Sequence, residues 1–217
     1  MRLLNKFTLV LMLMSTISLA LADDNKFYVQ FNAGGAIAPD FILGENVGSS
    51  SYNTKENYKD GFVTSLALGY RLMPSFRMEG ELMYQANNRD TQQLTYSYCC
   101  DNAGQPNTIT QNHALTGERK RSAFLINGYY DFKNKTAFTP YIGAGLGVYH
   151  LEINQRKNDM DFAWQAGAGL NYQLNNRVSV DVKYRYFGGA DAELGTYSPL
   201  LYSVGDHQLM AGIRIGF

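Results

Sequence analysis

The sequence lacks a charge surplus and, beyond its first 22 residues, an apolar run long enough to form a membrane-spanning helix. Without residues 1–22, 195 residues remain with 17 basic and 19 acidic side chains, a net charge of −2. That length suits one domain. The charge balance gives no support for nucleic-acid binding, which normally needs a basic surface. We therefore expect a single domain without a nucleic-acid partner.

Cysteine is also scarce, because the chain has only Cys99 and Cys100, which are adjacent. No C-x-x-C pair and no zinc-like Cys/His spacing occurs, so we expect neither a metal nor another cofactor. In an oxidising compartment the two thiols could form a strained vicinal disulfide or a cross-link to another chain. Reduced or independently oxidised thiols are the alternative, and the sequence leaves the choice open.

The N-terminal segment 1–22 has the pattern of a secretory signal peptide. Arg2 and Lys6 precede an apolar run, which ends in the small-x-small sequence Ala20-Leu21-Ala22. A membrane-spanning anchor fits less well because the run is short and ends in small residues. We predict that the mature chain begins at Asp23 and that the protein is exported, without a lipoprotein anchor.

Aromatic residues and glycine are abundant, with 16 Tyr, 12 Phe and 21 Gly. In VSVDVKYRY, residues 178–186, charged side chains occupy every second position between apolar ones. This period of two indicates a strand, since successive side chains point to opposite faces. Eight such segments occur, at 26–34, 61–72, 76–85, 122–132, 140–150, 162–172, 178–186 and 207–217. The sequence therefore predicts an all-β fold.

The connections between these segments differ in length. They are short at about 72–75, 133–136 and 174–177, and long at about 38–60, 88–120, 151–160 and 188–205. An even number of strands, with short turns at one end and long loops at the other, is typical of outer-membrane barrels. We predict that residues 23–217 form an eight-stranded antiparallel up-and-down transmembrane β-barrel with three short periplasmic turns and four long outer loops.

The glycines on the less apolar face of the strands indicate whether the charged side chains point into the barrel or out of it. A solvated face gains nothing from glycine, whereas the narrow interior of an eight-stranded barrel needs it to make room for large neighbours. The inward charges nearly balance, as a closed interior requires. They are Arg71, Arg77, Glu79, Glu81, Asp131, Asp181, Lys183, Arg185 and Arg214. We predict a polar plug in which Asp181 lies beside Arg214.

Two further groups follow from the strand assignment. Glu79 and Glu81 could meet Lys183 and Arg185 across the barrel, because their strands lie on opposite sides of it. The outward aromatic residues should form belts at the two membrane boundaries. One belt comprises Tyr70, Phe76, Tyr130, Phe132, Phe138 and Tyr172, and the other comprises Phe62, Tyr84, Phe124, Phe162, Trp164 and Tyr186.

Four stretches resemble the bacterial outer-membrane β-barrel family of opacity-type proteins and surface antigens. They are FTPYIGAGLGVYH at 138–150, FAWQAGAGLNYQL at 162–174, Tyr184-Arg185-Tyr186 and Ile215-Gly216-Phe217. The resemblance covers residues 25–217 and implies a place in the outer membrane. It also implies that Phe217 is the C-terminal signal read by the barrel assembly machinery. An outward aromatic residue at the membrane boundary would give the same ending.

The outer end holds two candidate contact regions. Arg119, Lys120 and Arg121 could pair with lipopolysaccharide phosphates, or could simply be a solvated strand end. The segment 195–205 exposes an aromatic and apolar cluster that could bind a partner or fold over the barrel mouth. Its members are Tyr197, Leu200, Leu201 and Tyr202.

The sequence leaves three functions to compare. The resemblance and the long loops favour a surface antigen or adhesin-like protein that binds a host surface, matrix or environmental partner. An envelope-integrity barrel without a ligand is the second. A lipid A-modifying enzyme is the third, with Ser122 as nucleophile, His150 as base and Glu152 orienting it, although the His-x-Ser spacing of lipid A deacylases is absent. We expect a non-enzyme.

Overall fold

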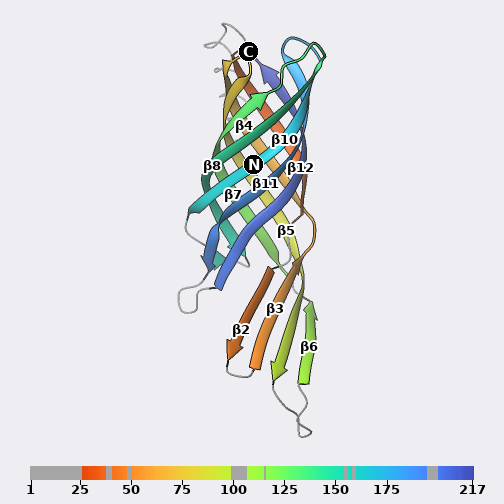
Figure 1. Cartoon of the computed structure of the whole chain (residues 1–217), viewed down its shortest axis with the longest axis vertical. Coiled ribbons are helices and arrows are strands. Elements are labelled where there is room, and N and C mark those ends of the chain that lie inside the picture. Colours follow the sequence, from red (N-terminus) through yellow and green to blue (C-terminus); the bar gives the residue numbers. More distant parts are fainter. Residues whose placement is uncertain are drawn as a thin grey trace, which may run out of the picture.

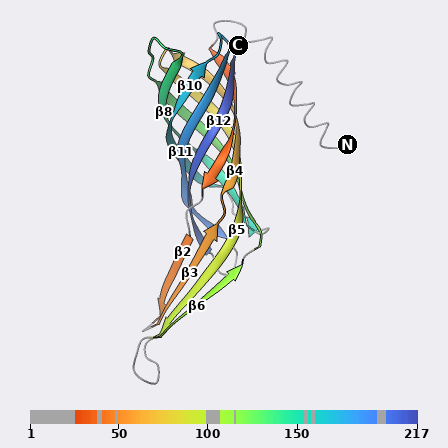
Figure 2. The same ribbon diagram turned by 90° about the vertical axis from the view of Figure 1, so that its right-hand side faces the viewer.

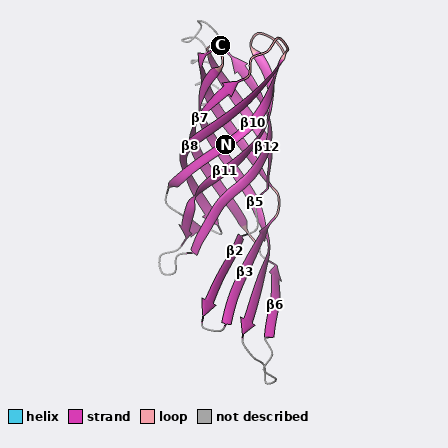
Figure 3. Ribbon diagram, viewed as in Figure 1, coloured by secondary structure: helices cyan, strands magenta, loops and turns pink. Residues whose placement is uncertain are grey.

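The computed structural model describes residues 26–37, 41–47, 50–98, 107–114, 116–153, 156–157, 160–194 and 200–217. The predicted signal peptide, residues 1–22, and the predicted mature start lie outside them. No helix in the described ranges has the length and apolar character needed to cross a membrane. The described chain is built from strands (Figure 3).

Eight antiparallel strands form a closed ring (Figure 1). In ring order they are β1 (Phe27–Ile37), β4 (Gly61–Met73), β5 (Phe76–Tyr98), β7 (Glu118–Asp131), β8 (Phe138–Ile153), β10 (Asp161–Gln173), β11 (Val178–Leu194) and β12 (Leu200–Gly216). The first strand closes the ring by pairing with the last, from Tyr28 opposite Gly216 to Ile37 opposite His207. The predicted eight-stranded barrel is confirmed.

A second, four-stranded sheet continues from one end of the barrel along its long axis (Figures 1 and 2). Its order is β2 (Phe41–Val47), β3 (Ser50–Tyr58), the outer part of β5, and β6 (Asn107–Ala114). We call these strands the extension: β2, β3, residues 90–98 of β5, and β6. Strand β5 belongs to both sheets, because its 23 residues run from the short-turn end of the barrel into the extension.

The extension changes the interpretation of the long connections. Segments 38–60 and 88–120, which we expected to be loops, contain β2, β3, β6 and the ends of neighbouring strands. The connections at 151–160 and 188–205 also continue as ladders, through β9 (Arg156–Lys157) and through β11 with β12. Hydrophobic alternation did not reveal the extension because its residues are mostly polar.

The barrel wall shows the predicted alternation of inward and outward side chains. On β7 every inward position is buried, and the outward positions between them are exposed or, at Lys120, partly exposed. Outward residues such as Leu82, Ile126 and Leu146 are apolar and more than half exposed. Polar side chains such as Gln30, Glu81 and Arg185 are buried inside the ring. An apolar outer wall around a polar interior is the arrangement that a hydrocarbon solvent requires.

Aromatic rings contact one another on the outer wall in two groups. At the short-turn end the pairs are Phe27 with Tyr70, Phe76 with Tyr130, Tyr130 with Phe132, and Phe138 with Tyr172. At the other end, Phe62 contacts Tyr84 and Trp164 contacts Tyr186. Such rings suit the two membrane boundaries, where an apolar body and a polar tip meet different solvents.

Inward glycines make room for tyrosine rings on neighbouring strands. A Cβ atom added to Gly69 would lie 2.0 Å from Cζ of Tyr28, and one added to Gly143 would lie 2.1 Å from Cδ1 of Tyr129. At Gly169 the added atom would lie 2.4 Å from Cζ of Tyr141. The glycine content of the inner face thus has a steric reason.

We predict that Gly169→Ala destabilises the barrel, because the new methyl group must displace the Tyr141 ring and would also lie 2.8 Å from the Val182 carbonyl oxygen. The expected loss is about 1–3 kcal/mol in the free energy of unfolding. Gly128→Ala is the matched control, since its added Cβ meets nothing within 4 Å. Urea unfolding in lipid vesicles measures both, and equal stabilities would contradict the packing argument.

Candidate functional site

A carboxylate at the centre of the barrel interior connects strands on opposite sides. Arg185 on β11 donates from Nη1 to both oxygens of Glu81 on β5, at 2.8 and 2.9 Å. Asn127 and Gln165 also donate to Glu81, at 2.7 and 3.2 Å. Arg185 Nε donates to Gln208 at 2.6 Å. The structure therefore brings Glu81 and Arg185 together, one of the cross-barrel contacts considered from the sequence.

A second cluster surrounds Arg77, which lies on the same strand as Glu81. Its guanidinium contacts Glu79 and donates to Asp131 at 3.1 Å. The Arg77 guanidinium carbon lies 3.9 Å from the ring centre of Tyr129 and 4.6 Å from that of Tyr141. The charge is thus held by two carboxylates and two aromatic faces. Glu79 pairs with Arg77 on its own strand, whereas Lys183 or Arg185 had been considered as its partner.

A third cluster lies nearer the short-turn end. Arg214 donates to Asp181 at 3.2 Å and to Gln30 at 2.9 Å, and the Tyr141 hydroxyl donates to Asp181 at 2.6 Å. The Asp181–Arg214 contact is the one expected from counting residues along the strands. Arg71 is half-buried, and its guanidinium carbon lies 5.3 Å from the ring centre of Tyr28.

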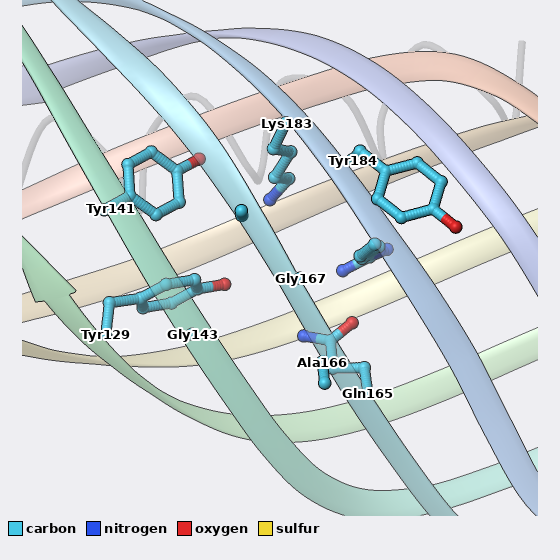
Figure 4. A pocket seen from close by; sticks show the side chains of 10 residues that line it. Tyr129, Tyr141, Gly143, Gln165, Ala166, Gly167, Lys183 and Tyr184 are labelled. Atoms are coloured by element: carbon cyan, nitrogen blue, oxygen red, sulfur yellow. The ribbon is translucent and has the colours of Figure 1, made fainter.

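Lys183 faces a small cavity among these clusters (Figure 4). Tyr129, Tyr141, Gln165 and Arg185 also line it, and its volume is about 10 Å³. Oε1 of Gln165 and Nη2 of Arg185 are buried without a hydrogen-bond partner in the described part of the protein. A cavity of this size accommodates about one water molecule. It is too small for an organic ligand.

The outer half of the interior contains an apolar cluster. Leu125, Tyr149, Leu151, Phe187 and Met210 belong to one buried cluster there. The rings of Tyr149 and Phe187 meet edge to face, with centres 6.3 Å apart. This cluster fills part of the lumen with apolar side chains, which adds an apolar component to the predicted polar plug.

Arg119 and Arg121 point into the barrel, which corrects their assignment as lipopolysaccharide contacts. Both are buried and both contact Asp206, Arg119 at 3.4 Å. The Arg121 guanidinium carbon also lies 4.7 Å from the ring centre of Phe187. The physical reason is strand alternation, which sends residues 119 and 121 to one side of β7 and residue 120 to the other. Of the three, only Lys120 faces outward, where it pairs with Glu118 at 2.6 Å.

The parity of Phe124 and Ile126 on the same strand could have revealed this orientation. Asp206, however, was not predicted, because it lies between the connection at about 188–205 and the strand expected at 207–217. Its side chain is fully buried on β12, across the barrel from the two arginines. Arg119, Arg121 and Asp206 must therefore be added to the predicted set of inward charges.

We predict that Arg121→Ala lowers the free energy of unfolding by about 3–5 kcal/mol, because it removes one partner of a buried ion pair. Lys120→Ala is the matched control one position away, where an exposed pair is worth about 0–1 kcal/mol. Urea midpoints in lipid vesicles compare the two variants. A Lys120 variant that loses as much stability as the Arg121 variant would contradict the inward assignment.

The three residues considered for catalysis lie on the outer face of β7 and β8. Ser122 is directly opposite His150 in the ladder, and Glu152 is opposite Lys120. No hydrogen bond joins Ser122 to His150 among the described residues. No group of three or more His, Cys, Asp or Glu that could hold a metal occurs in the described ranges either. The ladder brings Ser122 and His150 together but does not connect them as nucleophile and base.

Several predicted contact residues have little or no structural description. Cys99, Cys100 and Tyr197 lie outside the described residues. Leu200, Leu201 and Tyr202 lie in β12, opposite Leu194, Glu193 and Ala192. At the chain end, the backbone N–H of Phe217 donates to the carbonyl of Phe27 at 3.0 Å, so the last residue continues the seam that closes the barrel.

Comparison with known proteins gives the context of this architecture. A family model described as "Outer membrane protein beta-barrel domain" matches residues 7–214. Outer membrane protein PagN of Salmonella typhimurium is 32% identical over 88 residues, which cover 35% of this chain and 37% of PagN. A Rickettsia conorii protein named as a candidate adhesin is 24% identical over 229 residues, covering 91% of this chain and 84% of that protein.

A solved structure shares the fold. The crystal structure of Neisserial surface protein A has a TM-score of 0.58 and 19% identity, and the match covers 88% of this chain and 97% of that one. The PagN alignment spans about a third of the length of PagN. Together these matches place the chain in the bacterial outer membrane.

Proposed function

The chain belongs to the outer membrane protein β-barrel family, and on that premise we propose that it is a surface adhesin whose extension binds a host or environmental partner. The observation that carries the proposal is the extension itself. The barrel closes by pairing β1 with β12 and does not need β2, β3 or β6 for closure. A four-stranded sheet held clear of the barrel therefore has a use other than completing the fold (Figure 2).

The surface of the extension supports a binding role. Residues 91–97 of β5 are partly exposed, and the side chains at 108–114 of β6 are exposed on both faces. Most are Thr, Gln, Asn, Ser and Tyr, which combine hydrogen-bonding groups with low charge. Such side chains give adaptable polar contacts and, from Tyr, rigid apolar area. The name of the Rickettsia conorii relative points to the same class of function.

The filled barrel interior supports a role in which the barrel holds the extension at the cell surface, rather than a role in transport or catalysis. A cross-barrel ion pair lies at its centre, and an apolar cluster together with the pairs of Asp206 occupies its outer half. Ser122 and His150 are not joined by the hydrogen bond that links a nucleophile to its base. We therefore assign no catalytic residue. Lys120 remains a candidate contact for lipopolysaccharide phosphates, and Phe217 remains a candidate signal for the barrel assembly machinery.

We predict that removing the extension abolishes attachment and leaves the barrel folded. The variant replaces residues 41–57 and 91–115 with short turns. All residues that pair β1 with β4, β4 with β5 and β5 with β7 in the barrel are kept. A non-adherent bacterium displaying the intact protein should attach to host cells or matrix, and the shortened protein should not. Resistance of the folded barrel to unfolding in detergent confirms that both forms are assembled.

The control for this prediction is the barrel exterior. A variant with Ser122→Ala and His150→Ala changes the outer wall without touching the extension, and its attachment should equal that of the intact protein. Equal attachment by the shortened and intact proteins would contradict the proposal. Loss of envelope integrity without loss of attachment in the shortened form would favour the structural role instead.

A further inference from the structure

Strand β6 is an edge strand of the extension, and its outer edge has no pairing partner among the described residues. It pairs with β5 over eight consecutive residues, from Thr91 opposite Ala114 to Tyr98 opposite Asn107, without a register shift. In a strand the N–H and C=O groups of alternate residues point to opposite edges. The outer edge of β6 therefore presents a regular row of backbone donors and acceptors.

Natural proteins normally protect such an edge. Charged side chains, proline, bulges and short length are the usual devices against pairing with other chains. Strand β6, NTITQNHA, contains no Asp, Glu, Lys, Arg, Pro or Gly. The opposite edge strand, β2, is shorter and contains Gly44 and Glu45. The two edges of one sheet thus differ in charge, and the uncharged β6 has the properties of a pairing template.

The charge of the extension limits which partner the edge can take. Among β2, β3, residues 90–98 and β6, Lys55 is the single Lys or Arg, against Glu45, Glu56 and Asp90. Recognition of a polyanion needs a cluster of cations, which this set does not supply. An uncharged edge instead selects through main-chain hydrogen bonds, as in strand addition.

A second copy in the same membrane is a poor partner for this edge. Two barrels in one membrane would be related by a two-fold axis parallel to the barrel axis, whereas β6 is inclined to that axis (Figure 2). The two β6 strands would therefore cross at an angle. Strand pairing requires neighbouring strands to lie side by side at a constant spacing. Symmetric self-pairing therefore fails.

We propose that β6 binds an extended, uncharged polypeptide segment of a partner protein by strand addition, which makes the segment the fifth strand of the extension. This rests on the proposed adhesin function and names the chemistry of its partner. Affinity comes from the backbone of Asn107–Ala114, and specificity from exposed side chains such as Ile109 and His113 on one face and Thr110 and Asn112 on the other.

The test uses the full-length mature protein in lipid nanodiscs and the labelled peptide TQQLTYSY. This peptide is the sequence of Thr91–Tyr98, the strand that already pairs with β6. Two derivatives carry N-methyl groups on odd or on even backbone amides, so they have the same side chains and nearly the same methylation. In strand addition either the odd or the even backbone amides of the peptide face β6, so only one of the two derivatives loses its hydrogen bonds to β6.

The expected result is binding of the unmodified peptide and a difference in affinity of about tenfold or more between the two derivatives, since several hydrogen bonds are lost in one of them. Thr110→Lys on the edge should weaken binding, because an edge lysine opposes pairing. Thr95→Lys places the same charge directly opposite on the interior strand β5 and should weaken binding much less. Fluorescence anisotropy of the labelled peptides measures binding of the unmodified peptide, of the two derivatives, and of the unmodified peptide to each of the two protein variants.

Equal binding of the two derivatives, or no binding of the unmodified peptide, would overturn the inference. So would concentration-dependent self-association that Thr110→Lys removes, because the partner would then be a second copy. Attachment of bacteria by the intact protein is scored separately. If attachment persists while the peptides fail, the adhesin proposal stands and strand addition falls. If the peptides behave as expected without attachment, the edge is supported and the adhesin proposal falls.

Discussion

Closure of the ring between β1 and β12 is the constraint on which the rest of the barrel depends. In hydrocarbon no water can satisfy a free strand edge, so the first and last strands must pair with each other. The backbone bond from Phe217 to Phe27 extends that pairing to the final residue. Closure in turn fixes a narrow interior with eight strands around it, and every inward side chain must fit and be satisfied there.

The interior meets this demand with two kinds of packing. Tyr28, Tyr129 and Tyr141 lie over glycines of neighbouring strands, and their hydroxyls or faces meet charges. Cross-barrel pairs such as Glu81 with Arg185 then join strands that are not neighbours. Because removing one partner of such a pair leaves a buried charge, the network ties the strands into one cooperative unit. The extension lies outside this constraint, and its edge at β6 is open to water.

Much of the barrel was predictable from the sequence, because lipid outside and a packed interior impose a period of two on all eight strands. The same physics predicted the inward glycines and the proximity of Asp181 and Arg214. The extension was not predictable, since the residues of its strands are mostly polar and give no hydrophobic period. The error at Arg119 and Arg121 came from treating neighbouring cations as one patch, although strand alternation separates them from Lys120. Asp206 was missed because the last strand was expected to begin at residue 207, whereas β12 begins at Leu200.

Amide hydrogen exchange in lipid nanodiscs, resolved by residue, tests most directly the claim that closure removes every edge in the barrel while the extension keeps an open edge at β6. The account predicts that amides of β1 and β12 from Tyr28 to Ile37 and from His207 to Ile215 are as protected as those of β8 and β10. It also predicts that alternate amides of Asn107–Ala114 exchange rapidly. Rapid exchange along the β1–β12 seam, or uniform protection of β6, would contradict it.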